Sequence, residues 1–181
     1  MIKNFLILLL FFYSNRVLAD DQIEIIKNVE KVNSLYFNFK QINNNIIETG
    51  YCDIMYPNKI HCVYDGDDAK QIFVENDNLI ILEKDGKKNS YRIDNSLFQI
   101  ILNKEDLTNT IKKSQILDEN KKNFIAKSSD NQNGTLELYF DKKNYLISGW
   151  KFQNYDKSEI KFILDKVKIN VDNKDKFALP N

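Results

Sequence analysis

The stretch "YCDIMYPNKIHCVYDG", residues 51–66, carries both cysteines of the chain on the two arms of one turn. Cys52 and Cys62 each stand five residues from Pro57, and Pro57-Asn58 is strong turn punctuation. A three-residue loop over 56–58 would place the cysteines directly opposite each other on antiparallel strands. Opposed Cβ atoms lie about 4.5–5.5 Å apart there, whereas a disulfide needs ~3.5–4.5 Å, so a bridge is feasible at a close pair. We interpret the segment as a hairpin stapled by a Cys52–Cys62 disulfide, with two free buried thiols as the alternative.

The first twenty residues, "MIKNFLILLLFFYSNRVLAD", have the pattern of a cleaved secretory signal. Lys3 precedes an apolar run over residues 5–13, and small residues lead to Ala19. The apolar run is about half of the ~20 residues that a bilayer-spanning helix needs. We therefore expect residues 1–19 to be a cleaved signal peptide and residues 20–181 to form a single exported domain. An oxidising destination agrees with a disulfide.

The charge balance argues against nucleic acid as a partner. Lys3 and Arg16 are removed with residues 1–19, so the 26 basic residues become 24, against 26 acidic ones. A nucleic-acid-binding protein would show a basic footprint instead.

One amphipathic helix is followed mostly by strands. From Gln22 to Tyr36 the apolar residues fall on one helical face. Period-two alternation begins at residue 35, and strands are predicted over the following ranges: 35–41, 46–56, 59–64, 70–75, 79–84, 89–93, 115–118, 123–128, 135–141, 145–153, 158–164 and 166–171. The apolar positions change from even to odd numbers after Leu164, which favours a β-bulge in one long strand.

Residues 94–113, "DNSLFQIILNKEDLTNTIKK", interrupt the strands and start with a capping asparagine or serine. We predict two short helices in this segment. The first, over 97–102, is apolar nearly all round, so it should plug a cavity or cover a core. The fold class is therefore mainly β with helices, in which a strongly curved antiparallel sheet wraps around the helical segments.

Signals of catalysis are weak. His61 is the only histidine, and no glycine-rich phosphate loop, G-x-S-x-G or H-E-x-x-H occurs. One histidine with two cysteines makes an incomplete metal shell. We expect no enzyme activity, no catalytic residue, no metal and no cofactor.

Several motifs follow one another along the mature chain: an amphipathic first helix, "FNFKQ", Gly50, the turn 57–59, "NSLFQIIL", "LYFDKKNYLISGW" and a terminal "FALP". In this order they resemble the outer-membrane lipoprotein carrier family, LolA. The resemblance implies a curved, incomplete antiparallel β-barrel (half-barrel) closed by the N-terminal helix and a short helical lid.

The resemblance also implies a function. A monomeric carrier in the periplasm of a Gram-negative bacterium would take acylated lipoproteins from an inner-membrane ABC lipoprotein-release complex. It would pass this cargo to an outer-membrane lipoprotein receptor. An exported domain that senses lipid or protein as an adaptor or regulator, on the same half-barrel, is the alternative; an unrecognised enzyme is a third.

Four positions depart from the family pattern. Many relatives carry an arginine before the turn that ties the lid, where this chain has Tyr56; the proline expected at the lid helix is Leu97. The family's aromatic residues on the two hairpin arms correspond to Cys52 and Cys62. The bridge would then fasten two positions that face the cavity.

Face parity selects the candidate residues for acyl-chain contact, with ordinary core packing as the alternative for each. These cavity candidates are Phe37, Phe39, Ile54, Tyr56, Leu97, Phe98, Ile101, Trp150, Phe152 and Phe162.

Overall fold

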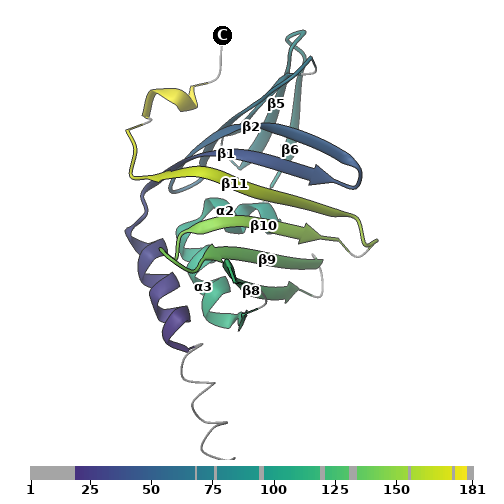
Figure 1. Ribbon diagram of the computed structural model, residues 1–181. Helices are drawn as coiled ribbons and strands as arrows, with labels where there is room; N and C mark the ends of the chain where they lie inside the picture. Colours follow the sequence, from purple (N-terminus) through teal and green to yellow (C-terminus); the bar gives the residue numbers. More distant parts are fainter. Residues whose placement is uncertain are drawn as a thin grey trace, which may run out of the picture.

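A computed structural model of the chain describes residues 19–67, 69–75, 77–93, 96–118, 121–130, 134–154, 156–172 and 174–178. Within these ranges the chain is mostly antiparallel β-sheet (Figure 1). The strands are β1 (Ser34–Asn43), β2 (Ile46–Met55), β3 (Lys59–Tyr64), β4 (Lys70–Glu75), β5 (Asn78–Glu83), β6 (Lys88–Arg92), β7 (Gln115–Leu117), β8 (Asn123–Asp130), β9 (Gly134–Asp141), β10 (Ile147–Gln153) and β11 (Glu159–Ile169). The helical segments are residues 19–31, α2 (Leu97–Leu102), α3 (Lys104–Lys113) and the 3-10 turn η1 (Lys174–Phe177). The expected signal peptide, apart from Ala19, lies outside the described residues.

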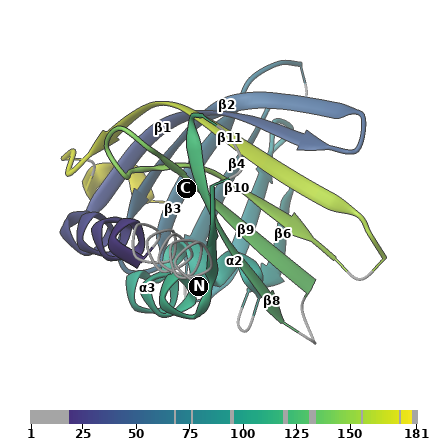
Figure 2. The ribbon, with the colours of Figure 1, turned by 60° about the horizontal axis from the view of Figure 1, so that its bottom comes forward.

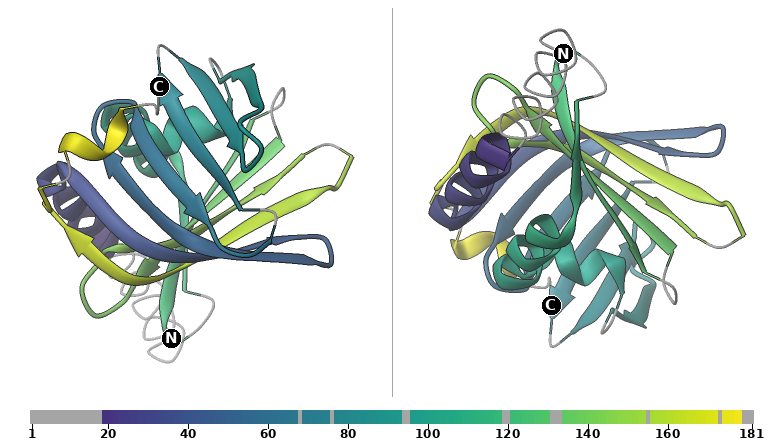
Figure 3. Two further views of the ribbon diagram at one scale, coloured as in Figure 1. Left: turned by 90° about the horizontal axis from the view of Figure 1, so that it is seen from above. Right: turned by 90° about the horizontal axis from the view of Figure 1, so that it is seen from below.

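The strands form one eleven-stranded sheet in the order β6-β5-β4-β3-β2-β1-β11-β10-β9-β8-β7 over the described ranges. The sheet has two halves, β1–β6 and β7–β11, and within each half strands adjacent in sequence pair with each other. The pairing of β1 with β11 joins the two halves. The sheet is strongly curved and remains open, with β6 and β7 at its two edges (Figure 3). The predicted incomplete antiparallel barrel is confirmed.

The helices α2 and α3 connect the two edge strands and lie on the inner side of the sheet (Figure 3). The helix over residues 19–31 lies beside α3 (Figure 2), where the Gln22 side-chain amide donates to the carbonyl oxygen of Ile111 over 2.7 Å. Ile25 and Ile111 are fully buried in the same apolar core as the inner face of the sheet. Burial of one stripe therefore fixes the N-terminal helix against the α2–α3 segment.

The expected two helices in residues 94–113 are confirmed, with Ser96 as the cap of the first; the cap of the second is Asn103. The Ser96 hydroxyl accepts from the Gln99 N–H, and the Asn103 side chain accepts from the N–H groups of Glu105 and Asp106. These bonds satisfy backbone donors that the first turn of a helix leaves unpaired.

The predicted end of the first helix is wrong by about one turn. The helix ends at residue 31, and Ser34 already pairs with Met55 in the sheet. Leu35 fits both periodicities, since it is buried in the strand as it would be on the helix. Sheet hydrogen bonds on both sides of β1 override the helical continuation.

The predicted bulge in one long strand is confirmed. Tyr36 pairs with Lys168 and Asn38 with Asp165, so Phe37 faces two residues of β11. Lys166 has a φ of 52°, in the left-handed region. The extra residue returns the apolar side chains of β11 to the inner face.

Candidate functional site

An apolar cavity of about 310 Å³ lies between the inner face of the sheet and α2. Both halves of the sheet contribute to it, and Phe98 is its wall on the α2 side. Its lining is formed by Gln41, Cys52, Ile60, Cys62, Tyr64, Lys70, Ile72, Leu79, Ile81, Phe98, Trp150, Phe152, Ile160 and Phe162. An apolar cavity of ~150 Å³ admits benzene, so this one has room for roughly a dozen carbon atoms on that scale. The described conformation can accept part of one alkyl chain.

The cavity brings together four of the ten candidates that face parity selected: Phe98, Trp150, Phe152 and Phe162. The Phe98 ring lies 6.5 Å from Phe152 between centroids, so the helix and β10 meet across the cavity. Trp150 stacks on Phe162 at 5.0 Å. Contact of these side chains with cargo stays a prediction.

Four further candidates lie behind this surface, in the core. Phe37 and Ile54 are fully buried, and Phe39 and Ile101 nearly so. The Phe37 ring meets Trp150 edge-on at a centroid distance of 5.9 Å. These residues support the lining and do not form it.

Of the last two candidates, Tyr56 lies outside the cavity. Tyr56 lies in the hairpin turn and lines a separate small pocket under the N-terminal helix, with Val29, Leu107 and Ile147 among its neighbours. Burial raises the pKa of the Tyr56 phenol well above its usual range, so the ring stays neutral. The backbone of Leu97 begins α2, and its side chain lies outside the description.

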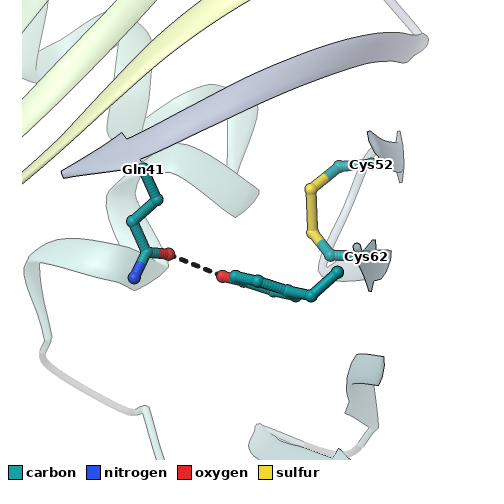
Figure 4. The surroundings of a disulfide bond; sticks show 4 residues. Gln41, Cys52 and Cys62 are labelled. Carbon is teal, nitrogen blue, oxygen red and sulfur yellow. Dashed lines mark hydrogen bonds between the residues drawn. A yellow bond between two sulfur atoms is a disulfide. The ribbon is translucent and has the colours of Figure 1, made fainter. Parts of the chain in front are cut away.

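The predicted Cys52–Cys62 disulfide is confirmed. The two residues are directly paired between β2 and β3, and their Cα atoms are 4.1 Å apart. The bridge forms part of the cavity wall, beside Gln41 (Figure 4). It therefore fastens two cavity-facing positions, as the family correspondence implied.

The lid is tied to the hairpin turn by contacts that the sequence did not reveal. We use "lid" for α2 and α3, residues 97–113. The Asn58 N–H donates to the carbonyl oxygen of Leu102 over 2.9 Å. The Lys104 ammonium lies 5.8 Å from the centre of the Tyr56 ring and donates to the Asn33 side-chain oxygen over 3.0 Å. A lysine on the lid thus lies over the ring of Tyr56, the position at which the family resemblance implied an arginine.

A chain of hydrogen bonds crosses one end of the cavity. We call its members, Gln41, Glu48, Tyr64 and Lys70, the polar belt; each comes from a different strand of β1 to β4. The Tyr64 hydroxyl donates to the Gln41 Oε1 over 2.6 Å, and the Gln41 amide donates to the Glu48 Oε2 over 3.0 Å. The Lys70 Nζ is 2.5 Å from the Glu48 Oε1 and 4.5 Å from the centre of the Tyr64 ring. Figure 4 shows the bond at Gln41 next to the disulfide.

The polar belt lies at the solvent end of the cavity. Along the inward-facing positions of β2, exposure rises from Cys52 at 1% to Ile46, at the tip, at 64%. Glu48 lies between them, with 29% of its side chain exposed. Burial, with the Glu48 charge adding, raises the pKa of the Tyr64 phenol, which therefore remains a neutral donor. Gln41 continues the inward row of Phe37 and Phe39, and this alternation was the signal in the sequence that could have found the belt.

The described ranges contain no group of three or more His, Cys, Asp or Glu side chains placed to hold a metal ion. No described helix is both long and apolar enough to cross a bilayer.

Solved structures share the fold at very low sequence identity. An uncharacterised conserved protein from Thermus thermophilus matches with a TM-score of 0.52 and 5% identity, over 90% of this chain and 94% of that chain. A chain from the MucA/MucB complex of Pseudomonas aeruginosa matches with a TM-score of 0.51 and 11% identity, over 90% of this chain and 61% of that chain. A LolA superfamily protein from Nitrosomonas europaea matches with a TM-score of 0.44 and 5% identity, over 86% and 96% of the two chains.

No curated protein matches the sequence in a direct comparison. The family model "Outer membrane lipoprotein carrier protein LolA" matches residues 30–179, which include the whole sheet and the lid. With that match added to the open half-barrel and its helical lid, the chain belongs to the LolA family of outer membrane lipoprotein carrier proteins.

Proposed function

We propose that this protein is a periplasmic carrier that shields the acyl chains of lipoproteins. It would receive them from an inner-membrane ABC release complex and deliver them to an outer-membrane lipoprotein receptor. The apolar cavity between the sheet and α2 is the observation that carries this proposal. Membership of the LolA family supports it.

The energetics of acyl chains call for such a cavity. Exposing one sixteen-carbon chain to water costs about 0.8 kcal/mol per methylene, or roughly 13 kcal/mol in total. A carrier that recovered all of this free energy could not release its cargo. A cavity that accepts part of one chain at rest, and more after the lid moves, gives moderate affinity.

The lid has the construction that such a movement requires. Its polar ties to the hairpin turn are one backbone bond and Lys104, which can break without unfolding the sheet. Opening would also have to expose part of the apolar surface that Ile101, Leu102 and Leu107 bury in the core. We propose that Phe98, Trp150, Phe152 and Phe162 contact the acyl chains directly. Phe37, Phe39, Ile54 and Ile101 would become accessible only as the lid opens.

Replacing Phe98 by glutamate tests the cavity. A carboxylate in the wall would have to be desolvated by a bound alkyl chain, which opposes binding. Phe98→Glu should therefore remain folded, as judged by circular dichroism, and fail to release lipoprotein from spheroplasts. Tyr91→Glu is a matched control, because Tyr91 is 56% exposed on the edge strand β6. Normal release by the Phe98 variant would contradict the carrier assignment.

A second candidate function is an adaptor that senses lipid or protein. The same fold occurs in a chain of the MucA/MucB complex, which supports a role in binding another protein. Mass spectrometry of the native protein purified from its own cells distinguishes the two. Acylated peptide in the extract supports the carrier, whereas a co-purifying protein or free lipid supports the adaptor.

The proposed export has its own test. Amino-terminal sequencing of the mature protein should begin at Asp20 if residues 1–19 are a cleaved signal peptide. A mature chain that begins at Met1 would contradict it.

A further inference from the structure

The polar belt is an unexpected feature of an apolar cavity. Lys70 and Glu48 form an ion pair whose side chains are only 24% and 29% exposed. Such a pair loses hydration when it is partly buried, and well-packed apolar residues of similar size are often equally stable or better. Stability alone therefore gives little reason for a charged pair and two polar side chains at this end of the cavity.

The belt offers hydrogen-bond donors to whatever occupies the cavity. A lysine ammonium has three N–H donors and a glutamine amide has two. In the belt, Glu48 accepts one bond from Lys70 and one from Gln41. Gln41, Tyr64 and Lys70 line the cavity. The remaining N–H capacity of Gln41 and Lys70 suits a ligand that presents acceptor oxygens.

The charge balance of the polar belt favours a ligand with neutral acceptor oxygens over an anionic one. Lys70 and Glu48 neutralise each other, and the other two members are uncharged at neutral pH. A strongly anionic headgroup would meet the Glu48 carboxylate next to Lys70, which disfavours it. Neutral carbonyl oxygens avoid this repulsion.

We infer that the polar belt binds the carbonyl oxygens of the ester or amide linkages of an acylated ligand. The alkyl chain beyond the linkage lies deeper, along the disulfide and Trp150, which line the cavity and are almost fully buried. The belt thereby sets how far a chain enters before its linkage stops at the solvent end. This inference rests on the proposed function, because it requires that acyl chains enter the cavity.

The test compares two synthetic lipopeptides that differ only in the linkage. One carries two sixteen-carbon chains as esters on a glyceryl-cysteine, and the other carries the same chains as ethers, without carbonyl oxygens. Trp150 is the only tryptophan and lines the cavity, so its fluorescence reports binding. The wild-type protein should bind the ester about tenfold more tightly than the ether, which corresponds to one or two net hydrogen bonds.

Two belt variants complete the experiment. Gln41→Leu and Lys70→Met should each abolish the tenfold preference, so that ester and ether bind with equal affinity. Lys84→Met, an exposed lysine in the β5–β6 turn, should keep the tenfold preference. A general packing defect would weaken both ligands together, and a preference that persists in both belt variants would also overturn the inference.

The possible outcomes distinguish carbonyl binding by the polar belt from the proposed carrier function. Equal binding of ester and ether by the wild-type protein overturns the belt and leaves the acyl carrier standing. Failure to bind either lipopeptide overturns the carrier, and the belt with it.

Discussion

The carboxylate of Asp53, fully buried in β2, is held by Lys176 from the turn η1 near the C-terminus. The Lys176 Nζ lies 3.0 Å from the Asp53 Oδ2 and 3.2 Å from the Oδ1. Asp53 points away from the cavity, since its neighbours Cys52 and Ile54 face inward. The contact therefore fastens the C-terminal segment to the outer face of the sheet.

Removing the lysine that holds this buried carboxylate should destabilise the fold. Lys176→Met is expected to lower the free energy of unfolding in urea by about 2 kcal/mol, because a fully buried carboxylate then loses two charge-assisted hydrogen bonds. Lys168→Met is the matched control: the Lys168 and Lys176 ammonium groups lie 5.5 and 5.4 Å from the centre of the same Tyr36 ring. Equal losses in both variants would assign the effect to the ring and not to Asp53.

Loosening the lid should change its local opening and leave global stability nearly constant. Lys104→Met loses the contact with the Tyr56 ring and the bond to Asn33, together worth about 1 kcal/mol. Amides in α2 should then exchange hydrogen roughly fivefold faster, with a melting temperature close to that of the wild type. The exposed Lys112→Met in the last turn of α3 provides the comparison. Unchanged exchange in α2 would show that the backbone bond to Leu102 suffices.

Removing the disulfide should cost stability without closing the cavity. The bridge joins residues ten apart in sequence, and the entropy of so short a loop predicts a loss of about 3 kcal/mol or less. The double variant Cys52→Val/Cys62→Val keeps the lining apolar. We expect a lower melting temperature with retained lipopeptide binding; loss of binding in a folded variant would give the bridge a direct role in the site.

Glu137 on β9 should contribute to stability in a pH-dependent way. Burial acts to raise its pKa, but hydrogen bonds from Lys151 and Tyr139 outweigh this and lower it overall. A lowered carboxyl pKa means that the stabilisation is complete above the unfolded value of about 4.3 and is lost as the pH falls through the folded value. Glu137→Gln should therefore flatten the decline in unfolding free energy between about pH 5 and pH 3. Glu30→Gln, on the exposed face of the N-terminal helix, should leave the decline intact.

Local patterns predicted the local elements of this fold well. The alternation of Trp150, Phe152 and Phe162 placed these residues on one face because a strand has a fixed period of two. The same rule does not extend to Tyr56, which follows the end of β2 at Met55 and packs against the core in the turn. The rule did not select Gln41, because a polar side chain on an inward-facing row is not expected to line an apolar cavity.

Long-range features had no comparable signal. The pairing of β1 with β11 consists of backbone bonds between the two ends of the chain, and backbone bonds leave no mark in side-chain pattern. The contact of Lys104 with Tyr56 depends on where α2 ends relative to the turn. Both follow from tertiary geometry and could be found only in three dimensions.

The position of β11 between β1 and β10 has a consequence for how the protein folds during its synthesis. In the described sheet, backbone pairing between the two walls runs through this strand, which follows all the other strands in chain order. A polypeptide that still lacks Glu159–Ile169 has two separate stacks of strands and no enclosure between them. Such an unfinished chain has no compartment in which a lipid could be trapped before synthesis is complete.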